Sequence, residues 1–209
     1  MLNIIQKKNI WFAFSGSLIV LGAIALFFWG LPFGIDFTGG SLLEAKLEQP
    51  ATSTDLRETL APLGLGEITV QETNEQSFLF RTKDLTEETH QSVLSTLGEK
   101  YGNVEEISFE SIGSSLGKEL QQKTLYAFLA VLVAIILYIA WAFRKVSRPV
   151  QSWKYGIIAV VTLFHDVFIT VGIFSIISHF TGYEIGLPFV AAILTILGYS
   201  VNDTIVVFD

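Results

Sequence analysis

The residues best suited to chemistry in this sequence are a few polar side chains set within long apolar runs. His165 and Asp166 are adjacent, and Asn202, Asp203 and Thr204 are consecutive. A charged side chain at the centre of a bilayer costs about 2.5–3.5 kcal/mol on insertion scales, so such residues usually face protein or water. A carboxylate in a wet crevice could bind a proton, lose its charge and bias a conformational change. The same side chains could instead hold helices together by hydrogen bonds worth about 0.6–2 kcal/mol each, and for Asp203 both interpretations stay open.

Asp166 lies near the middle of its apolar run, and the spacing there favours a structural, helix-positioning role. At about 1.5 Å per residue it is roughly 18 Å beyond Lys154. Thr162 and Thr170 stand four residues to either side of it and predict a polar stripe. His165 could relay protons or be a satisfied buried histidine. Direct pairing of His165 with Asp166 is not expected, because adjacent helix residues point about 100° apart.

Other chemistries find less support in the sequence. The chain has no cysteine, which excludes disulfides and thiolate sites, and its three histidines are scattered without metal-ligand spacing. No constellation for nucleophilic hydrolysis is recognisable. An intramembrane aspartyl protease would need two facing aspartates, which Asp166 and Asp203 could supply, but neither lies in the glycine-rich motif of such enzymes. His90 and His179 are expected at a surface or an interface, and no metal or cofactor is predicted.

Composition indicates that the helices positioning these residues lie in a membrane. The chain has 209 residues, 51% of them hydrophobic and 16% charged, and its net charge of -7 disfavours a nucleic-acid partner. A bilayer core of about 30 Å needs about 20 apolar residues in a helix. Four runs meet this length: Ile10 to Gly30, Leu125 to Phe143, Tyr155 to Phe180 and Leu187 to Phe208. The first run is too long for a signal-peptide core and is predicted to be an uncleaved helix.

Basic residues predict how the four helices are oriented. Lys7 and Lys8 precede the first helix, and residues 144–154 form a basic loop between the second and third. The positive-inside rule therefore places the N-terminus and this loop in the cytoplasm. The segment 31–124 is then extracytoplasmic, with a helix entry from residue 114, and 181–186 forms a short outer loop before the fourth helix at 187–209.

The outer segment 31–113 shows a strand and helix pattern of its own. Alternating apolar residues and helical spacings predict strands over 41–47, 68–72, 77–82 and 104–109 and helices over 53–63 and 86–102. Ser53 or Thr54 is expected to cap the first of these helices and Thr86 the second. The order βαββαβ predicts an α+β ferredoxin-like domain inserted between the helices of a multi-pass membrane protein.

Two motifs carry a resemblance to a known family. GIDFTGGS at Gly34 to Ser41 and GYSVNDTIVVFD at Gly198 to Asp209 closely resemble the SecF proteins of the SecD/SecF family of protein-export membrane proteins. LFHDVFITVGIF, AAILTILGYS and SLGKEL support the match, which spans nearly the whole chain. The sequence departs from the family at Ile112-Gly113-Ser114, where Val-Gly-Pro is usual. The family continues beyond Asp209 with two further membrane helices, so the resemblance implies four helices of six.

The resemblance implies a subunit of the bacterial Sec translocase, with no enzymatic activity. With SecD, such a subunit uses the proton-motive force to pull preproteins across the cytoplasmic membrane. Asp203 would belong to the proton pathway, and Asn202, Thr204, Asp166 and His165 are its other candidate members. The implied partners are SecD, the SecYEG translocon, YajC, YidC, unfolded preproteins and the lipid bilayer.

The GIDFTGG motif is predicted to act as a junction. Gly39 and Gly40, with Gly34, would let the chain turn sharply out of the first helix, while Asp36 and Thr38 bond nearby backbone amides. A structural hinge is therefore expected. The alternative is that Asp36 touches SecD or transmits motion to the outer domain.

Two other functions stay open. One is a structural subunit that stabilises SecD without carrying protons, which would need polar residues at the same helix contacts. The other is a small-molecule exporter of the related resistance-nodulation-division superfamily. About 90 outer residues leave little room for the substrate pockets of such an exporter.

Overall fold

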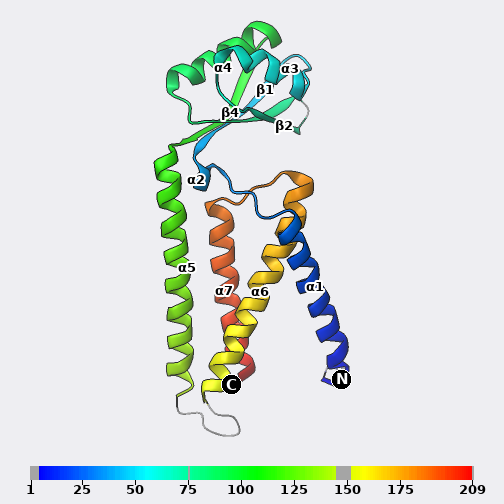
Figure 1. Cartoon of the computed structure of the whole chain (residues 1–209), viewed down its shortest axis with the longest axis vertical. Coiled ribbons are helices and arrows are strands. Elements are labelled where there is room, and N and C mark those ends of the chain that lie inside the picture. The colour runs from blue at the N-terminus through cyan, green and yellow to red at the C-terminus, as the bar shows by residue number, and fades with distance from the viewer. Residues whose placement is uncertain (1–4, 75, 145–151, 209) are drawn as a thin grey trace. The chain divides into compact units, whose positions relative to one another are not determined.

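The computed structural model describes residues 5–74, 76–144 and 152–208. The chain divides into two compact units (Figure 1). The helical unit comprises the chain up to Pro32 and from Thr124 onward, and the sheet unit comprises Phe33–Lys123. Lys145 and Arg148 of the basic loop, and Asp209 at the end of the last motif, lie outside the described residues.

Four helices in the described part of the chain are long and apolar enough to cross a membrane. They are α1 (Lys8–Phe28), α5 (Ser114–Ala142), α6 (Ser152–Thr181) and α7 (Leu187–Phe208). The four apolar runs of the sequence are therefore confirmed as helices. Helix α5 begins at Ser114, so its first turns belong to the sheet unit and the rest to the helical unit.

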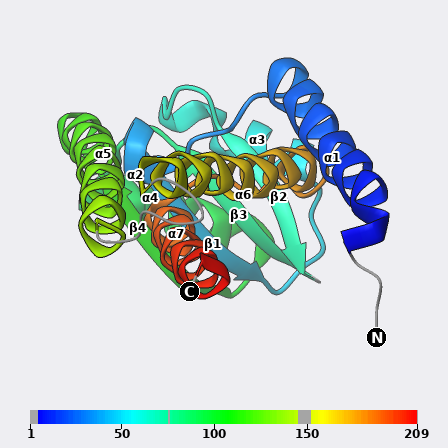
Figure 2. The same cartoon turned by 90° about the horizontal axis from the view of Figure 1, so that it is seen from below.

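Helix α6 is the central element of the helical unit. It is inclined, so its beginning lies near α5 and α7 and its end lies near the end of α1 (Figures 1 and 2). An apolar cluster joins its first turns to α5 and α7, and the buried members are Ile139, Phe143, Ala159, Leu163, Leu197 and Val201. Because α6 touches each of the other helices, its polar residues are placed where several elements meet.

A regular seam joins α1 to α6. The contacts recur every seven residues along both helices: Ser15 with His165, Gly22 with Gly172, and Trp29 with His179. The residue numbers of the contacting partners rise together along both helices, so the two helices run parallel. A seven-residue repeat keeps one face of each helix turned toward the other. Helix α7 runs the opposite way along α6, since Phe189 meets Phe174 while Ser200 meets Asp166.

The sheet unit contains four strands and two main helices. They are β1 (Gly40–Leu47), α3 (Ser53–Leu60), β2 (Thr69–Asn74), β3 (Ser77–Thr82), α4 (Glu87–Tyr101) and β4 (Val104–Ile112), with a short helix α2 (Ile35–Thr38) before them and a 3-10 turn at Ala61–Leu63. The strands form one antiparallel sheet in the order β2-β3-β1-β4. The succession of strands and helices is the one that the sequence predicts.

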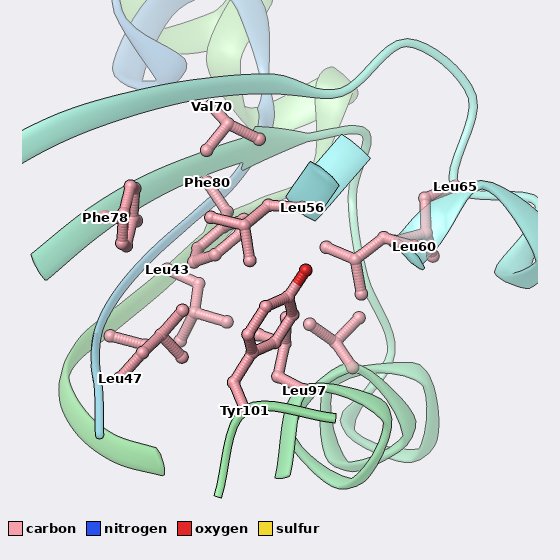
Figure 3. Close-up of a cluster of buried hydrophobic side chains, with 12 residues drawn as sticks. Leu43, Leu47, Leu56, Leu60, Leu65, Val70, Phe78, Phe80, Leu97 and Tyr101 are labelled. Carbon is pink, nitrogen blue, oxygen red and sulfur yellow. The ribbon is translucent and has the colours of Figure 1, made fainter. Parts of the chain in front are cut away.

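One face of this sheet packs against α3 and α4 (Figure 3). Strands β1 and β3 supply alternate side chains such as Leu43 and Phe80, while α3 supplies Leu56 and Leu60 and α4 supplies Leu97. Each of these five side chains is at most 1% exposed. Burial of this kind contributes about 1.5–3 kcal/mol for each large apolar side chain, so the unit has a hydrophobic core of its own.

Two details differ from the sequence predictions. Thr52, rather than Ser53 or Thr54, caps α3 by accepting a hydrogen bond from the Asp55 backbone N–H, because Ser53 is already the first residue of the helix and the cap precedes it. His90 is not at the surface but is 3% exposed. Its ring stacks on Phe109 with the ring centroids 3.8 Å apart, and the histidine lies on the face of α4 that covers the sheet.

Candidate functional site

Polar side chains from three helices of the helical unit meet around Asp166. The Ser200 hydroxyl of α7 donates to Asp166 Oδ2 over 2.6 Å. His165 Nδ1 lies 2.8 Å from Asp166 Oδ1, so both carboxylate oxygens have a partner. On the other side of the ring, His165 Nε2 is hydrogen-bonded to the Ser15 hydroxyl of α1. We call Ser15, His165, Asp166 and Ser200 the polar row.

The direct pairing of His165 with Asp166 corrects the expectation from helix geometry. The angle of about 100° between adjacent residues applies to their Cα–Cβ directions. The imidazole nitrogen and the carboxylate oxygen lie further out along their side chains and reach sideways toward each other. The structure therefore brings the two predicted residues into one hydrogen-bonded pair.

Two flanking threonines do not join this row. Thr162 donates to the Ile158 carbonyl oxygen and Thr170 to the Asp166 carbonyl oxygen, each four residues earlier on α6. Such bonds within one helix are a common arrangement for threonine. The predicted polar stripe of Thr162, Asp166 and Thr170 is thus replaced by a row that runs across the helices.

Sequence reasoning did not predict Ser15 and Ser200 as partners of the pair. A usable signal was the matching spacing: Ser15 and Gly22 are seven residues apart in α1, as His165 and Gly172 are in α6. An added Cβ at Gly172 would lie 2.5 Å from the Gly22 Cα atom, so the two backbones approach closely at this point. Small residues permit such an approach, which brings Ser15 within reach of His165.

The polar row resembles a hydrolase triad in its atoms. A serine hydroxyl bonded to His Nε2 and an aspartate bonded to His Nδ1 are the contacts of that site. A hydrolase also needs free N–H donors beside the serine to stabilise an oxyanion. Ser15 lies inside α1, where backbone N–H groups bond carbonyl oxygens one turn earlier. The row is therefore better suited to holding or passing a proton than to acyl transfer.

Asp203 has a different environment from Asp166. Asn202 and Asp203 are exposed on α7, and Thr204 donates to the Ser200 carbonyl oxygen of its own helix. Thr195, Tyr199 and Val206 are exposed on the same helix, whereas Leu197, Ser200 and Val201 are buried against α6. Gly198, between these two faces, has no heavy atom within 4 Å of an added Cβ in the described structure. Ser200, which bonds Asp166, and Asp203 are three residues apart on α7, so their side chains point about 60° apart, and Ser200 is buried whereas Asp203 is exposed.

The GIDFTGG motif forms a tightly packed corner within the sheet unit. The chain leaves α1 at Trp29 and Gly30, and Gly39 and Gly40 make the later turn from α2 into β1, with φ angles of +75° and +127°. An added Cβ at Gly39 would lie 2.6 Å from the Ser114 Cα atom. The prediction that Gly39 and Gly40 turn the chain out of the first helix is therefore wrong, because α2 lies between that helix and these glycines.

The same corner also constrains the start of α5. An added Cβ at Gly117 would lie 2.8 Å from the Gly39 backbone nitrogen. The Thr38 hydroxyl donates to the carbonyl oxygens of Gly34 and Gly39, whereas the sequence prediction paired it with backbone amides. This close packing restricts the backbone at Ser114, the position at which the family resemblance predicts a proline.

Ser41, directly after the two glycines, links three parts of the sheet unit. It is fully buried, and its hydroxyl accepts from the Leu85 backbone N–H over 2.8 Å. It also shares a hydrogen bond of 2.7 Å with Ser111 of β4, whose hydroxyl lies 2.9 Å from Asp84 Oδ1. The motif therefore ends in a hydrogen-bonded clamp that joins β1, β4 and the approach to α4.

The described residues include no group of three or more histidine, cysteine, aspartate or glutamate side chains that could hold a metal ion. The polar row contains only two side chains of these types, His165 and Asp166.

Two family models match the sequence. The model for the C-terminal region of the protein export membrane proteins SecD and SecF matches residues 92–209, and the SecD/SecF GG motif matches residues 24–51. The first match includes α6 and α7 with most of the polar row, and the second includes the packed corner.

Curated proteins and a solved structure agree with these matches. The protein translocase subunit SecF of Thermobaculum terrenum is 37% identical over the whole chain, and that of Desulfurispirillum indicum is 38% identical over 94% of it. The chain spans 69% and 62% of the lengths of these relatives. A crystal structure of SecDF from Thermus thermophilus, described as a translocon-associated membrane protein, has 28% identity and a TM-score of 0.77 over 96% of this chain and 26% of that one. The chain therefore belongs to the SecD/SecF family of protein-export membrane proteins.

Proposed function

We propose that this chain works as SecF does, as an accessory subunit of a protein translocase that acts together with SecD. The match extends along the whole chain to proteins named as translocase subunits. The structural relative unites SecD and SecF in its name and is described as associated with a translocon. A multi-pass membrane protein with an inserted sheet unit suits such a role, because it can act on both sides of a bilayer.

The proposed energy source is the proton-motive force. Moving one charge across 100 mV is worth about 2.3 kcal/mol, which changes an equilibrium about fifty-fold. One or two titrating groups are then enough to drive a conformational switch. The polar row is the observation that carries this proposal, because Asp166 and His165 connect α6 to both α1 and α7 through side-chain hydrogen bonds.

Asp203, with Asn202 and Thr204, is the second proposed part of the proton pathway. An exposed carboxylate on a membrane helix needs protein or water beside it, because lipid cannot solvate its charge. The exposed face of α7 that carries Thr195, Tyr199 and Asp203 is therefore the proposed face toward SecD. In this arrangement the pair of His165 and Asp166 holds a proton inside the subunit and Asp203 serves its boundary.

The remaining assignments follow from the same family membership. The N-terminus is proposed to be cytoplasmic and the sheet unit extracytoplasmic, in the inner membrane of a bacterium. The strand order and the two helices on one face support a ferredoxin-like fold for the sheet unit. The SecYEG translocon, YajC, YidC and unfolded preproteins are the proposed further partners, and two further membrane helices are expected in the complete subunit.

The test is export of a secreted reporter by cells that contain the complete subunit and SecD. Asp203→Asn and Asp166→Asn should each reduce proton-dependent export severely while the complex with SecD stays intact. Thr162→Val is the matched control, because this hydroxyl bonds the Ile158 carbonyl oxygen of its own helix and lies outside the polar row and the proposed face toward SecD. Normal export by both aspartate variants at matched membrane levels would contradict the proposal.

One observation favours a purely structural subunit as the second candidate. The bond from Ser200 to Asp166 would also hold α7 against α6 if no proton moved. In that case Asp166→Asn would release the subunit from SecD or lower its abundance. Export would then fall only in proportion to the amount of assembled complex. Measuring export per assembled complex separates the two functions.

A further inference from the structure

We propose that Ser15 and Ser200 are positioning residues of a proton-holding site formed by His165 and Asp166, which couples the protonation of α6 to its packing against α1 and α7. The inference rests on the proposed proton-driven function and assigns it two further residues, Ser15 on α1 and Ser200 on α7. Each serine lies on a different helix from the titrating pair and contacts one end of it.

The hydrogen bonds of the polar row allow one consistent assignment of protons. An ionised Asp166 accepts on both oxygens, so the Ser200 hydroxyl and His165 Nδ1–H are donors. With Nδ1 protonated, the neutral ring offers Nε2 as an acceptor, and the Ser15 hydroxyl donates to it. Each hydrogen-bond donor in the polar row then faces an acceptor.

The row can take up one more proton with a small rearrangement. An N–H bond forms at His165 Nε2, and the Ser15 hydroxyl rotates so that its oxygen accepts the new hydrogen. The imidazolium keeps its bond to Asp166 through Nδ1, and the Ser200 bond is unaffected. Loss of the same proton reverses the step. About a third of each side chain of the pair is exposed, 34% for His165 and 35% for Asp166, so neither is fully enclosed by the described helices.

The two serines differ from other hydroxyl residues of these helices. Thr162, Thr170, Thr181, Thr195 and Thr204 bond carbonyl oxygens of their own helix. Ser17, two residues from Ser15 on α1, likewise donates to the Phe14 carbonyl oxygen. Ser15 and Ser200 instead bond a titratable side chain on another helix. The hydrogen bonds of these two serines therefore link the packing of α1 and α7 against α6 to the protonation of the polar row.

The titratable groups on the packed elements are few. Helix α1 carries only Lys8, at its start, and α7 carries Tyr199 and Asp203. Asp203 lies three residues beyond Ser200 but is exposed. The part of α5 in the helical unit carries Tyr126 and Tyr138 as its titratable side chains. Among the described residues of α1, α6 and α7, His165 and Asp166 are therefore the only histidine and carboxylate side chains that contact each other.

The test uses the complete subunit with SecD and the translocon in vesicles, with export measured with and without an imposed proton gradient. Ser15→Ala and Ser200→Ala should each lower the gradient-stimulated rate about tenfold, the effect of losing one hydrogen bond to a charged group. Each should also change how that rate depends on pH. Ser17→Ala and Thr162→Val are the matched controls and should behave like the wild type, because each hydroxyl bonds a carbonyl oxygen of its own helix.

Double substitutions separate positioning from packing. If Ser200 acts through Asp166, Ser200→Ala should cause no further loss in an Asp166→Asn background, and Ser15→Ala none in a His165→Gln background. Additive losses, or serine variants whose gradient response and pH profile equal those of the wild type, would overturn the inference. Failure of the proposed function would look different, because the wild-type complex itself would then export at one rate with and without the gradient.

Discussion

Replacing Gly172 by alanine should separate α1 from α6 and break the polar row without touching any of its members. The added methyl group would lie 2.5 Å from the Gly22 Cα atom. Carbon atoms in contact prefer about 3.5–4.0 Å, so the backbones must move apart by about 1 Å or more. The hydrogen bond between Ser15 and His165, two turns earlier on the same seam, would lengthen or break.

The expected cost follows from two contributions. Overpacking of a close contact costs about 1–3 kcal/mol, because neither backbone can yield without losing other contacts. The lost interhelical hydrogen bond adds about 0.6–2 kcal/mol. Gly172→Ala should therefore lower the free energy of unfolding of the helical unit by about 2–5 kcal/mol.

The assay is reversible unfolding of the complete chain in mixed detergent micelles, followed by fluorescence. Trp29 stacks on His179 with 4.4 Å between ring centroids, at the far end of the same seam. A variant that keeps Trp29 and replaces the other three tryptophans by phenylalanine reports on this contact. Gly172→Ala should change the Trp29 emission of the folded state as well as the unfolding midpoint.

Gly156→Ala is the matched control on the same helix. No heavy atom lies within 4 Å of a Cβ added there, so the substitution should be neutral or stabilise α6 by up to about 1 kcal/mol through helix propensity. The reasoning about the seam is refuted if Gly172→Ala unfolds at the same detergent concentration as Gly156→Ala. It is equally refuted if Trp29 emission stays unchanged in a destabilised Gly172→Ala protein.

Three further predictions concern the sheet unit. Gly117→Ala should lower its thermal stability by about 1–3 kcal/mol, because an added Cβ would lie 2.8 Å from a backbone nitrogen, whereas Gly98→Ala meets nothing within 4 Å and should not. Ser41→Ala should cost about 1–3 kcal/mol in the same measurement, because a backbone N–H before α4 loses its partner. The pKa of Glu87 is held below its usual value by hydrogen bonds from Gln91 and then His90, so its stabilising effect is present above the usual pKa and is lost as the pH falls through the lowered one. Gln91→Ala should raise the pKa of Glu87 in an NMR titration of its carboxylate, and an unchanged pKa would contradict this assignment.

The elements of the fold could be predicted because each depends on a local pattern. Continuous apolar runs predict the four membrane helices, and β3 at Ser77–Thr82 begins and ends where the alternation predicts. The predicted surface position of His90 is wrong for a physical reason. Histidine is often exposed, and its burial here depends on the sheet beneath α4, where its ring stacks on Phe109.

The candidate site could be predicted only in part. His165, Asp166 and Asp203 are conspicuous because ionisable groups are rare in membrane helices. Ser15 is not, because a serine in such a helix usually bonds its own backbone, as Ser17 does. Its partner lies 150 residues away and depends on the register of two helices.

The two aspartates also require different explanations, although a hydropathy pattern treats them alike. Asp166 accepts hydrogen bonds from two side chains within its own subunit, so its charge is satisfied by α6 and α7 alone. Asp203 is exposed on α7, and the described structure gives it no such neighbours. A charge in a membrane helix must nevertheless be solvated. If SecD covers this face of α7 as proposed, it must bring polar groups or water to Asp203, whereas the described hydrogen bonds of Asp166 do not depend on that partner. A subunit purified without SecD should thus keep the polar row intact, and the effect of Ser200→Ala on its stability should be measurable in that state.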